Sequence, residues 1–148
     1  MTRCLAFGAS AILVFGFTAC QSAAPQATGN GPVPTVNPDF QVDANLAEMG
    51  REVFIVKDCR GCHSIGLGRS AGPDLFGVVE RRPIDWLNRF LADTDVMLDT
   101  DPVAQALLKQ HYNIRMPQVR MTDQEREALI HYIASATMDV RQVGVPQQ

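Results

Sequence analysis

The 148-residue sequence has no apolar run long enough to cross a membrane, since its most apolar stretch, Leu5 to Ala19, has 15 residues where about 20 are needed. It also lacks the alternating apolar runs and hairpin dipeptides that indicate β-strands. Lys57 and Lys109 are its only lysines, and the net charge is −3. A basic face is therefore absent, and no nucleic-acid partner is expected. The 46% apolar and 20% charged residues exclude collagen-like, coiled-coil and fully disordered chains.

The first twenty residues are organised like a bacterial lipoprotein signal. A short basic start precedes the apolar core, and Phe17–Cys20 resembles a lipobox, in which the cysteine is lipidated and becomes the mature N-terminus. We expect residues 1–19 to be a signal peptide, Cys20 to be a lipid anchor, and the protein to be exported to the periplasmic side of a bacterial membrane. Gln21, which is not Asp, makes the outer membrane a possible destination. The alternative is an ordinary secretory signal, with Cys20 incidental.

Composition divides the rest of the chain into a tether, a domain and a tail. Residues 20–42 carry the expected lipidated cysteine and a proline-rich tether, with too little apolar surface to fold alone. Phe40 offers the alternative that this segment wraps onto the domain. Residues 43–144 are enough for one modest core, and residues 145–148 form a short C-terminal tail. We expect one domain and no internal repeat.

Helical periodicity and capping signals predict an all-α domain. The four predicted helices are 46–57, opened by a capping box at Asn45 and Glu48; 84–91; 102–112, after Asp101 and Pro102; and 123–138, opened by a capping box at Thr122 and Glu125. The glycine-containing segment 64–79 is predicted to be an ordered loop. The segment 93–101 carries four acidic residues and is predicted to be a solvated loop.

The segment 59–63, CRGCH, matches the C-x-x-C-H pattern of covalent haem attachment. Two thiols three residues apart lie on one face of a helical turn and can reach the two vinyl groups at one porphyrin edge. His63 would then ligate the iron. A redox C-x-x-C needs a βαβ context, which is absent, and a zinc site needs four ligands, for which the sequence has few candidates. The motif therefore predicts one haem c bound through Cys59 and Cys62.

A methionine is the expected sixth ligand, since it raises the reduction potential of the haem. Met116 precedes Pro117, which biases it to an extended backbone and puts its thioether on a loop before the last helix. Met121, at the start of that helix, is the alternative. Replacement of Met116 by His111 or His131 would instead give a bis-His haem of lower potential.

With these motifs, the domain resembles the class I, mono-haem bacterial cytochromes c. The motifs that carry the likeness, which covers residues 47–136, are GREVF at 50–54, the haem motif, GPDL at 72–75, Met116–Pro117 and Tyr132–Ile133. The resemblance implies an all-α class I cytochrome c fold, with about four to five helices wrapped around one covalently bound haem c. It also implies a close glycine–aromatic crossing of the first and last helices, between Gly50 and Tyr132.

The resemblance further implies roles for residues around the haem. The carbonyl of Pro73 would accept a hydrogen bond from the imidazole of His63, which fixes its tautomer and increases its basicity. The residues expected to pack on the haem are Leu75 and Phe76. The candidates to bind the haem propionates, because buried carboxylates need paired donors, are Arg81, Arg82 and Trp86.

The function implied by the resemblance is electron transfer. The iron would cycle between Fe(III) and Fe(II) and exchange electrons with periplasmic or membrane redox proteins, for example a terminal oxidase or a nitrogen-oxide reductase. We expect the protein to be a monomer that is not an enzyme and has no small-molecule substrate. The alternatives are a haem subunit of a larger oxidoreductase complex, or a ligand-binding or peroxidase-like site with an open sixth position.

Overall fold

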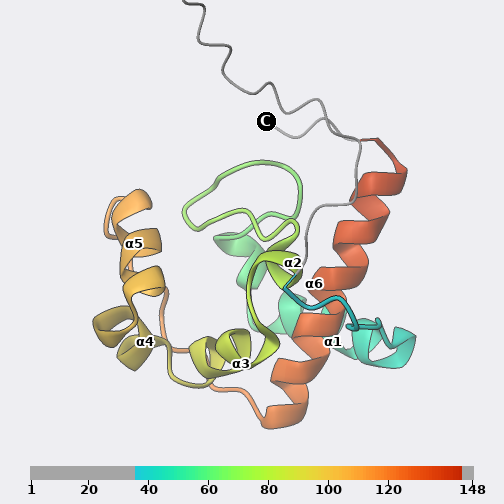
Figure 1. The fold of residues 1–148 in the computed structure, drawn as a ribbon, viewed down its shortest axis with the longest axis horizontal. Coiled ribbons are helices and arrows are strands. Elements are labelled where there is room, and N and C mark those ends of the chain that lie inside the picture. Colours follow the sequence, from blue (N-terminus) through green and yellow to red (C-terminus); the bar gives the residue numbers. More distant parts are fainter. Residues whose placement is uncertain (1–35, 145–148) are drawn as a thin grey trace, which may run out of the picture. The chain divides into compact units, whose positions relative to one another are not determined.

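The computed structural model describes residues 36–144. The expected signal peptide, the lipid anchor at Cys20, the tether up to residue 35 and the tail at 145–148 lie outside the described residues. The described part is helical and contains no β-strand, in agreement with the predicted all-α class (Figure 1). Its elements are α1 (Ala44–Val56), the 3₁₀ turn η1 (Cys59–Gly61), α2 (Val78–Arg81), α3 (Ile84–Ala92), α4 (Thr94–Thr100), α5 (Pro102–Gln110) and α6 (Asp123–Gln142).

Helices α2 and α4 were not predicted, so the described part has six α-helices rather than four to five. The prediction of a solvated loop at 93–101 is wrong, because this segment forms α4. The side chain of Asp93 caps the helix by accepting the N–H of Val96 at 3.1 Å, and Met97 and Leu98 are buried in the core. The acidic residues of α4 lie on its outer face. Their number in the sequence indicated a solvated loop, although Met97 and Leu98 form a buried inner face.

The predicted helix boundaries hold in part. Asp43, and not Asn45, caps α1, since its carboxylate accepts the N–H groups of Asn45 and Leu46 at 2.8 and 2.9 Å. Glu48 pairs with a neighbouring arginine on the helix surface and forms no capping box. The capping box of Thr122 and Glu125 at α6 is confirmed, although α6 runs four residues beyond its predicted end.

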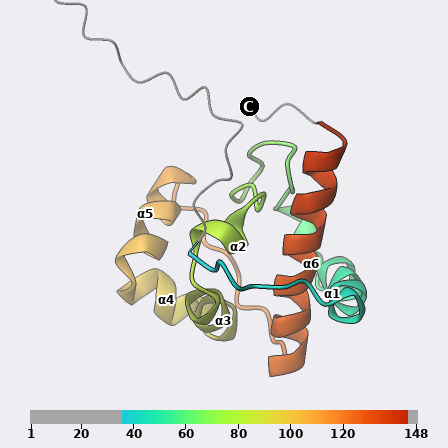
Figure 2. The ribbon, with the colours of Figure 1, turned by 45° about the vertical axis from the view of Figure 1, so that its right-hand side comes forward.

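Helices α1 and α6 cross in close contact and form one wall of the core. Figure 2 shows α1 nearly end-on beside α6. A Cβ atom on Gly50 would overlap the carbonyl oxygen of Ala128 and lie 2.8 Å from Cβ of Tyr132. The rings of Phe54 and Tyr132 pack with their centroids 5.3 Å apart. The glycine–aromatic contact implied by the resemblance is therefore present, and no other residue fits at position 50.

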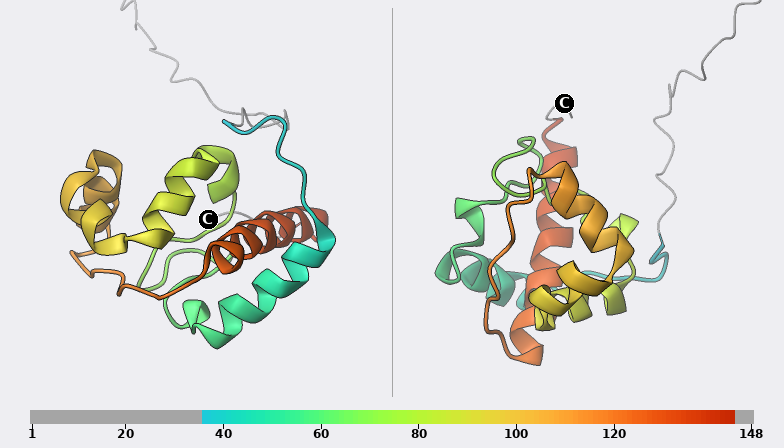
Figure 3. Two further views of the ribbon diagram at one scale, coloured as in Figure 1. Left: turned by 90° about the horizontal axis from the view of Figure 1, so that it is seen from below. Right: turned by 90° about the vertical axis from the view of Figure 1, so that its left-hand side faces the viewer.

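Helices α3, α4 and α5 form the opposite wall, and a long connection returns from α5 to α6. Helix α4 packs on both of its neighbours, and α3 also contacts α6. The returning connection, here called the Met116 loop (residues 111–122), runs along the side of the domain that also carries η1 (Figure 3). None of the described helices is both long and apolar enough to span a membrane.

The end of the predicted tether packs on the domain as an N-terminal strap (residues 36–43). Asn37 donates a hydrogen bond to a carbonyl oxygen at the end of α2 at 2.8 Å. The ring of Phe40 lies 4.8 Å from that of His131, and the N–H of Asp43 donates to Nδ1 of His131 at 3.0 Å. This part of the chain therefore follows the wrapping alternative that Phe40 offered.

Replacing Gly50 by alanine tests the helix crossing. The added Cβ meets backbone of α6 that cannot rotate away, so Gly50→Ala should lower the free energy of unfolding by about 3 kcal/mol. Val56→Ala, at an exposed position of α1, is the control and should change it by less than about 0.5 kcal/mol. Denaturant titration of the holoprotein measures both. A more stable Gly50→Ala, as helix propensity alone would give, would contradict the crossing.

Candidate haem site

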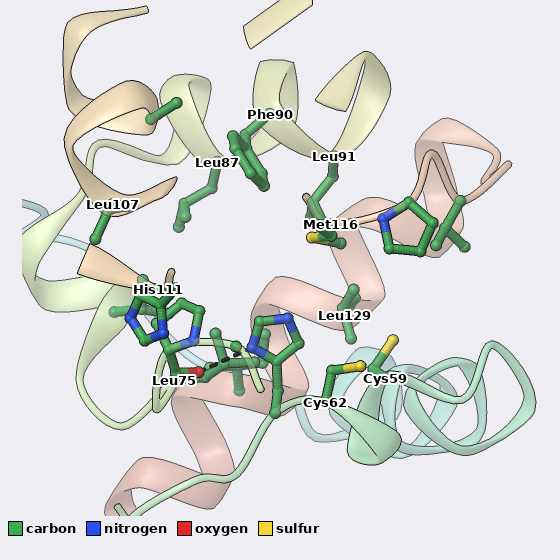
Figure 4. Close-up of a pocket in the computed structure, with 18 of the residues that line it drawn as sticks. Cys59, Cys62, Leu75, Leu87, Phe90, Leu91, Leu107, His111, Met116 and Leu129 are labelled. Atoms are coloured by element: carbon green, nitrogen blue, oxygen red, sulfur yellow. Dashed lines mark hydrogen bonds between the residues drawn. The ribbon is translucent and has the colours of Figure 1, made fainter. Parts of the chain in front are cut away.

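A deep apolar cleft separates the two walls of the domain (Figure 4). Its empty volume is about 1250 Å³, counted out to its open mouth. Both walls and the connecting loops contribute to its lining, and its apolar side chains include Phe54, Leu87, Leu98, Leu107, Leu129 and Ile133. Such walls suit the faces of a large flat apolar group.

Seven of the eight residues predicted to bind the cofactor line this cleft. They are Cys59, Cys62, His63, Pro73, Leu75, Trp86 and Met116. The eighth, Arg81, does not line it.

The two cysteines lie side by side at one end of the cleft, as Figure 4 shows. Asp58 takes a left-handed conformation (φ 56°) that ends α1, and η1 follows at once. The N–H groups of Cys62 and His63 both bond to the carbonyl of Cys59, at 3.2 and 2.9 Å. Both thiols are free. This tight turn presents two thiols and one imidazole to the same cavity.

The imidazole of His63 is fixed by its hydrogen bond to Pro73 and by the shape of Gly72. Nδ1 of His63 lies 2.8 Å from the carbonyl oxygen of Pro73, so Nδ1 carries the proton and Nε2 is left with a free lone pair. A Cβ on Gly72 would lie 2.5 Å from Cε1 of the same ring. The N–H of Gly72 is bonded to the carbonyl of Cys62 at 2.8 Å. The hydrogen bond that the resemblance implied is present, and Gly72 leaves room for the ring.

Asp74 organises the loop that carries Gly72 and Pro73, a role that sequence reasoning missed. Its carboxylate accepts the N–H groups of Gly66 and Phe76, both at 2.8 Å, and of Gly68 at 2.6 Å. Burial raises the pKa of Asp74, but these hydrogen bonds outweigh it, so the net pKa lies below its ordinary value. An aspartate within a glycine-containing loop was the available sequence signal.

Met116 and Met121 both line the cleft. Met116 extends into it from the Met116 loop, beside Leu91 (Figure 4). Met121 packs against the hydrophobic core, and its carbonyl accepts a hydrogen bond from Arg126 at 2.9 Å. Two thioethers are thus within the cavity, one from the middle of the loop and one from its end.

The predictions for Arg81, Arg82 and Phe76 are not supported by their positions. The Arg81 guanidinium donates to the carbonyl of Phe76 at 2.6 Å and is exposed outside the cleft. Arg82 lies over the ring of Trp86, 5.7 Å from its centroid, and neither it nor Phe76 lines the cavity. The arginine among the described lining residues is Arg115.

Two buried N–H-bearing rings line the cleft without a hydrogen-bond partner among the described residues. They are the indole of Trp86, at Nε1, and the imidazole of His111, at Nδ1. The pKa of Asp101 is lowered chiefly by its hydrogen bond from the backbone N–H of Ala104. His111 is 7% exposed, and burial lowers its pKa, which disfavours a positive charge on this ring inside the cleft.

This donor set fits a covalently attached haem. Apolar walls would cover its faces, two adjacent thiols could form its thioethers, and the free Nε2 of an oriented imidazole could ligate its iron. The indole N–H of Trp86, and Nδ1 of His111 when it carries the proton, could donate to carboxylates at its polar edge. The fold and the cleft therefore define an all-α haem protein of the c type.

Comparison with known proteins gives the family. Residues 47–137 match the model of the cytochrome c family, and the chain belongs to that family. The cofactor is covalently bound haem c, and the fold is that of class I cytochromes c.

Three relatives illustrate the similarity. A cytochrome c from Rhodothermus marinus superposes with a TM-score of 0.62 at 26% identity, covering 74% of this chain and 91% of that one. The cytochrome c domain of a Pseudomonas putida protein gives 0.57 at 33% identity, covering 67% and 97%. A cytochrome c oxidase subunit 2 from Alkalihalophilus pseudofirmus is 36% identical over 94 residues, 61% of this chain. The chain spans only 25% of that subunit.

Acid titration tests the role of Asp74. Because its folded pKa is lowered, its contribution is fully present above an unfolded pKa of about 3.9 and is lost as pH falls through the folded value. Asp74→Ala should lower the free energy of unfolding by about 2–4 kcal/mol at pH 7 and flatten its fall below about pH 4. Asp139→Ala, at an exposed site on α6, is the control. Equal acid sensitivity of Asp74→Ala and the wild type would contradict this role.

Proposed function

We propose that this cytochrome c carries single electrons between redox proteins, with His63 and Met116 as the axial ligands of a haem bound through Cys59 and Cys62. The haem supplies a one-electron Fe(III)/Fe(II) couple when bound. The observation that carries the proposal is that an oriented imidazole and a thioether from different ends of the chain share one apolar cleft. If His63 and Met116 both held the iron, no position would be left on it for a substrate, and we therefore expect no enzymatic activity.

The residues around the cleft suit electron transfer rather than catalysis on a bound substrate. The hydrogen bond from His63 to Pro73 holds the imidazole and increases its basicity. The apolar walls exclude water, so little reorganisation accompanies a change of charge inside them. The N–H groups of Trp86 and His111 would bind the haem propionates. Leu75, which lines the cleft, would pack on the macrocycle.

The mouth of the cleft gives a redox partner access to one cofactor edge. Lining residues that are exposed there include Cys62, Ala71, Ile114 and Pro117. The expected partners are periplasmic or membrane oxidoreductases, for example a terminal oxidase or a nitrogen-oxide reductase. A monomeric carrier suffices for this exchange.

Export and a lipid anchor at Cys20 complete the proposal. The N-terminal strap leaves the domain on the face opposite the one that carries η1 and the Met116 loop (Figure 3). Anchoring near a partner raises its effective concentration.

A fixed haem subunit of a larger oxidoreductase is the second candidate. The similarity to part of an oxidase subunit 2 favours it. Purification from membranes in mild detergent separates the two: a carrier comes away alone, whereas a subunit comes away with its complex.

Substitution of the two cleft methionines tests the axial assignment. Met116→Ala should keep its haem, lose the charge-transfer band of Met-ligated ferric haem, show a lower reduction potential and bind CO when reduced. Met121→Ala should retain the wild-type spectrum and remain closed to CO. If Met121→Ala opens the site and Met116→Ala does not, Met121 is the ligand. CO binding by the reduced wild type would instead favour a ligand-binding or peroxidase-like haem.

Replacing Cys20 by serine tests the anchor. The wild type expressed with its own N-terminus should sediment with membranes, and Cys20→Ser should be released in soluble form while keeping the same haem spectrum. Cys4→Ser, within the expected signal peptide, is the matched control and should leave membrane association unchanged. Equal membrane association of the wild type and Cys20→Ser would contradict lipidation at this residue.

A further inference from the structure

The Met116 loop has almost no backbone hydrogen bonds of its own where it carries Met116. Within the described part of the chain, the backbone–backbone bonds of this loop end at Ile114, and residues 115–121 make none. Pro117 contributes no N–H at all. Whatever holds Met116 in the cleft must therefore act through side chains.

Gln118, two residues after Met116, inserts its amide between the end of α3 and the start of α4. Its Oε1 accepts the N–H of Thr94 at 2.7 Å, and its Nε2 donates to the carbonyl of Ala92 at 3.2 Å. Thr94 is 1% exposed, whereas Gln118 lies at the surface, so the Gln118 amide covers the N–H of Thr94 from the solvent side. One side chain thus satisfies two polar groups that the helix ends leave unpaired.

Arg115, on the other side of Met116, attaches the loop to the same helix. Its guanidinium pairs with Asp99 at 2.9 Å and with Asp95 at 3.3 Å. These pairs are exposed, with 43% of the Arg115 side chain accessible, so each contributes little in water. The burial of Met97 and Leu98 fixes α4 in the core, and α4 is therefore a firm base for both contacts.

We propose that Gln118, and to a smaller extent Arg115, are positioning residues that hold the Met116 loop on α4 and thereby set how readily Met116 leaves the iron. The inference rests on the proposed axial ligation by Met116. When Met116 leaves, the iron opens to an external ligand, and the apparent affinity for that ligand is proportional to the open fraction. Loss of the two hydrogen bonds that Gln118 makes with Thr94 and Ala92 should increase that fraction.

Imidazole binding to the oxidised holoprotein measures the open fraction. Gln118→Ala should bind imidazole about tenfold more tightly than the wild type, because it removes both hydrogen bonds by which Gln118 attaches the loop to the helix ends. Arg115→Gln should change the affinity by no more than about twofold. Loss of the Met–iron charge-transfer band during the titration reports that Met116 is the group displaced.

Gln105→Ala is the matched control. Gln105 also donates its amide to α4, at the carbonyl of Asp99 (2.7 Å), but it lies on α5 and not in the Met116 loop. Its removal should leave imidazole affinity within about twofold of the wild type. An equal effect in Gln105→Ala and Gln118→Ala would overturn the proposal, since it would reflect general weakening of α4.

The remaining outcomes distinguish the positioning role of Gln118 from the axial ligation by Met116 on which it rests. Wild-type affinity in Gln118→Ala, with tight binding in Met116→Ala, would overturn the positioning role and leave the ligand assignment standing. Unchanged imidazole binding in Met116→Ala would refute the ligand assignment itself.

If Gln118→Ala gives no holoprotein, Gln118→Glu takes its place in the test. This variant keeps the oxygen that accepts from Thr94 and loses the donor to Ala92. It should then bind imidazole roughly threefold more tightly, and wild-type affinity would overturn the proposal.

Discussion

The contact of α1 with α6 at Gly50 determines how the haem motif and the Met116 loop lie relative to each other. The haem motif follows α1 after two residues, and the Met116 loop leads directly into α6. Lys57 joins these two segments, since its ammonium pairs with Glu125 at 3.2 Å and donates to the carbonyl of Arg120 at 3.0 Å. The residues on either side of the cleft are therefore brought together by one helix crossing and one bridging lysine.

The interior that this crossing creates is apolar and largely faces the cofactor. Leu87, Leu98 and Leu129 belong to the core and also line the cleft, so the same side chains pack the helices together and form the walls of the haem site. A domain of about a hundred residues buries only a modest core, and a group that binds the folded state alone adds its binding free energy to stability. Haem attachment and folding of this chain are therefore coupled.

Local signals made the haem motif, the capping box at Thr122 and the pairing of His63 with Pro73 accessible from the sequence, the last through its resemblance to a family. Tertiary contacts decided the rest. Asp43 displaced Asn45 as the cap of α1, although both are good caps, because the strap brings Asp43 onto α6. The inner face of α4 was hidden among acidic residues, and the contact of Gln118 with α4 joins residues 24 apart, a distance that no local pattern spans.

The two sides of the cleft are held by interactions of different range, and this difference bears on function. His63 lies within a segment fixed by the covalent attachment points, by Pro73 and by three N–H groups converging on Asp74. Met116 lies in a loop secured by a few side-chain contacts, those of Gln118 and Arg115 with the ends of α3 and α4 and that of Lys57 with the carbonyl of Arg120. Local unfolding begins where contacts are few, so the thioether side should open before the imidazole side. If Met116 is the sixth ligand, as proposed, a cytochrome c built this way would keep its cofactor oriented through His63 even when that ligand is exchanged.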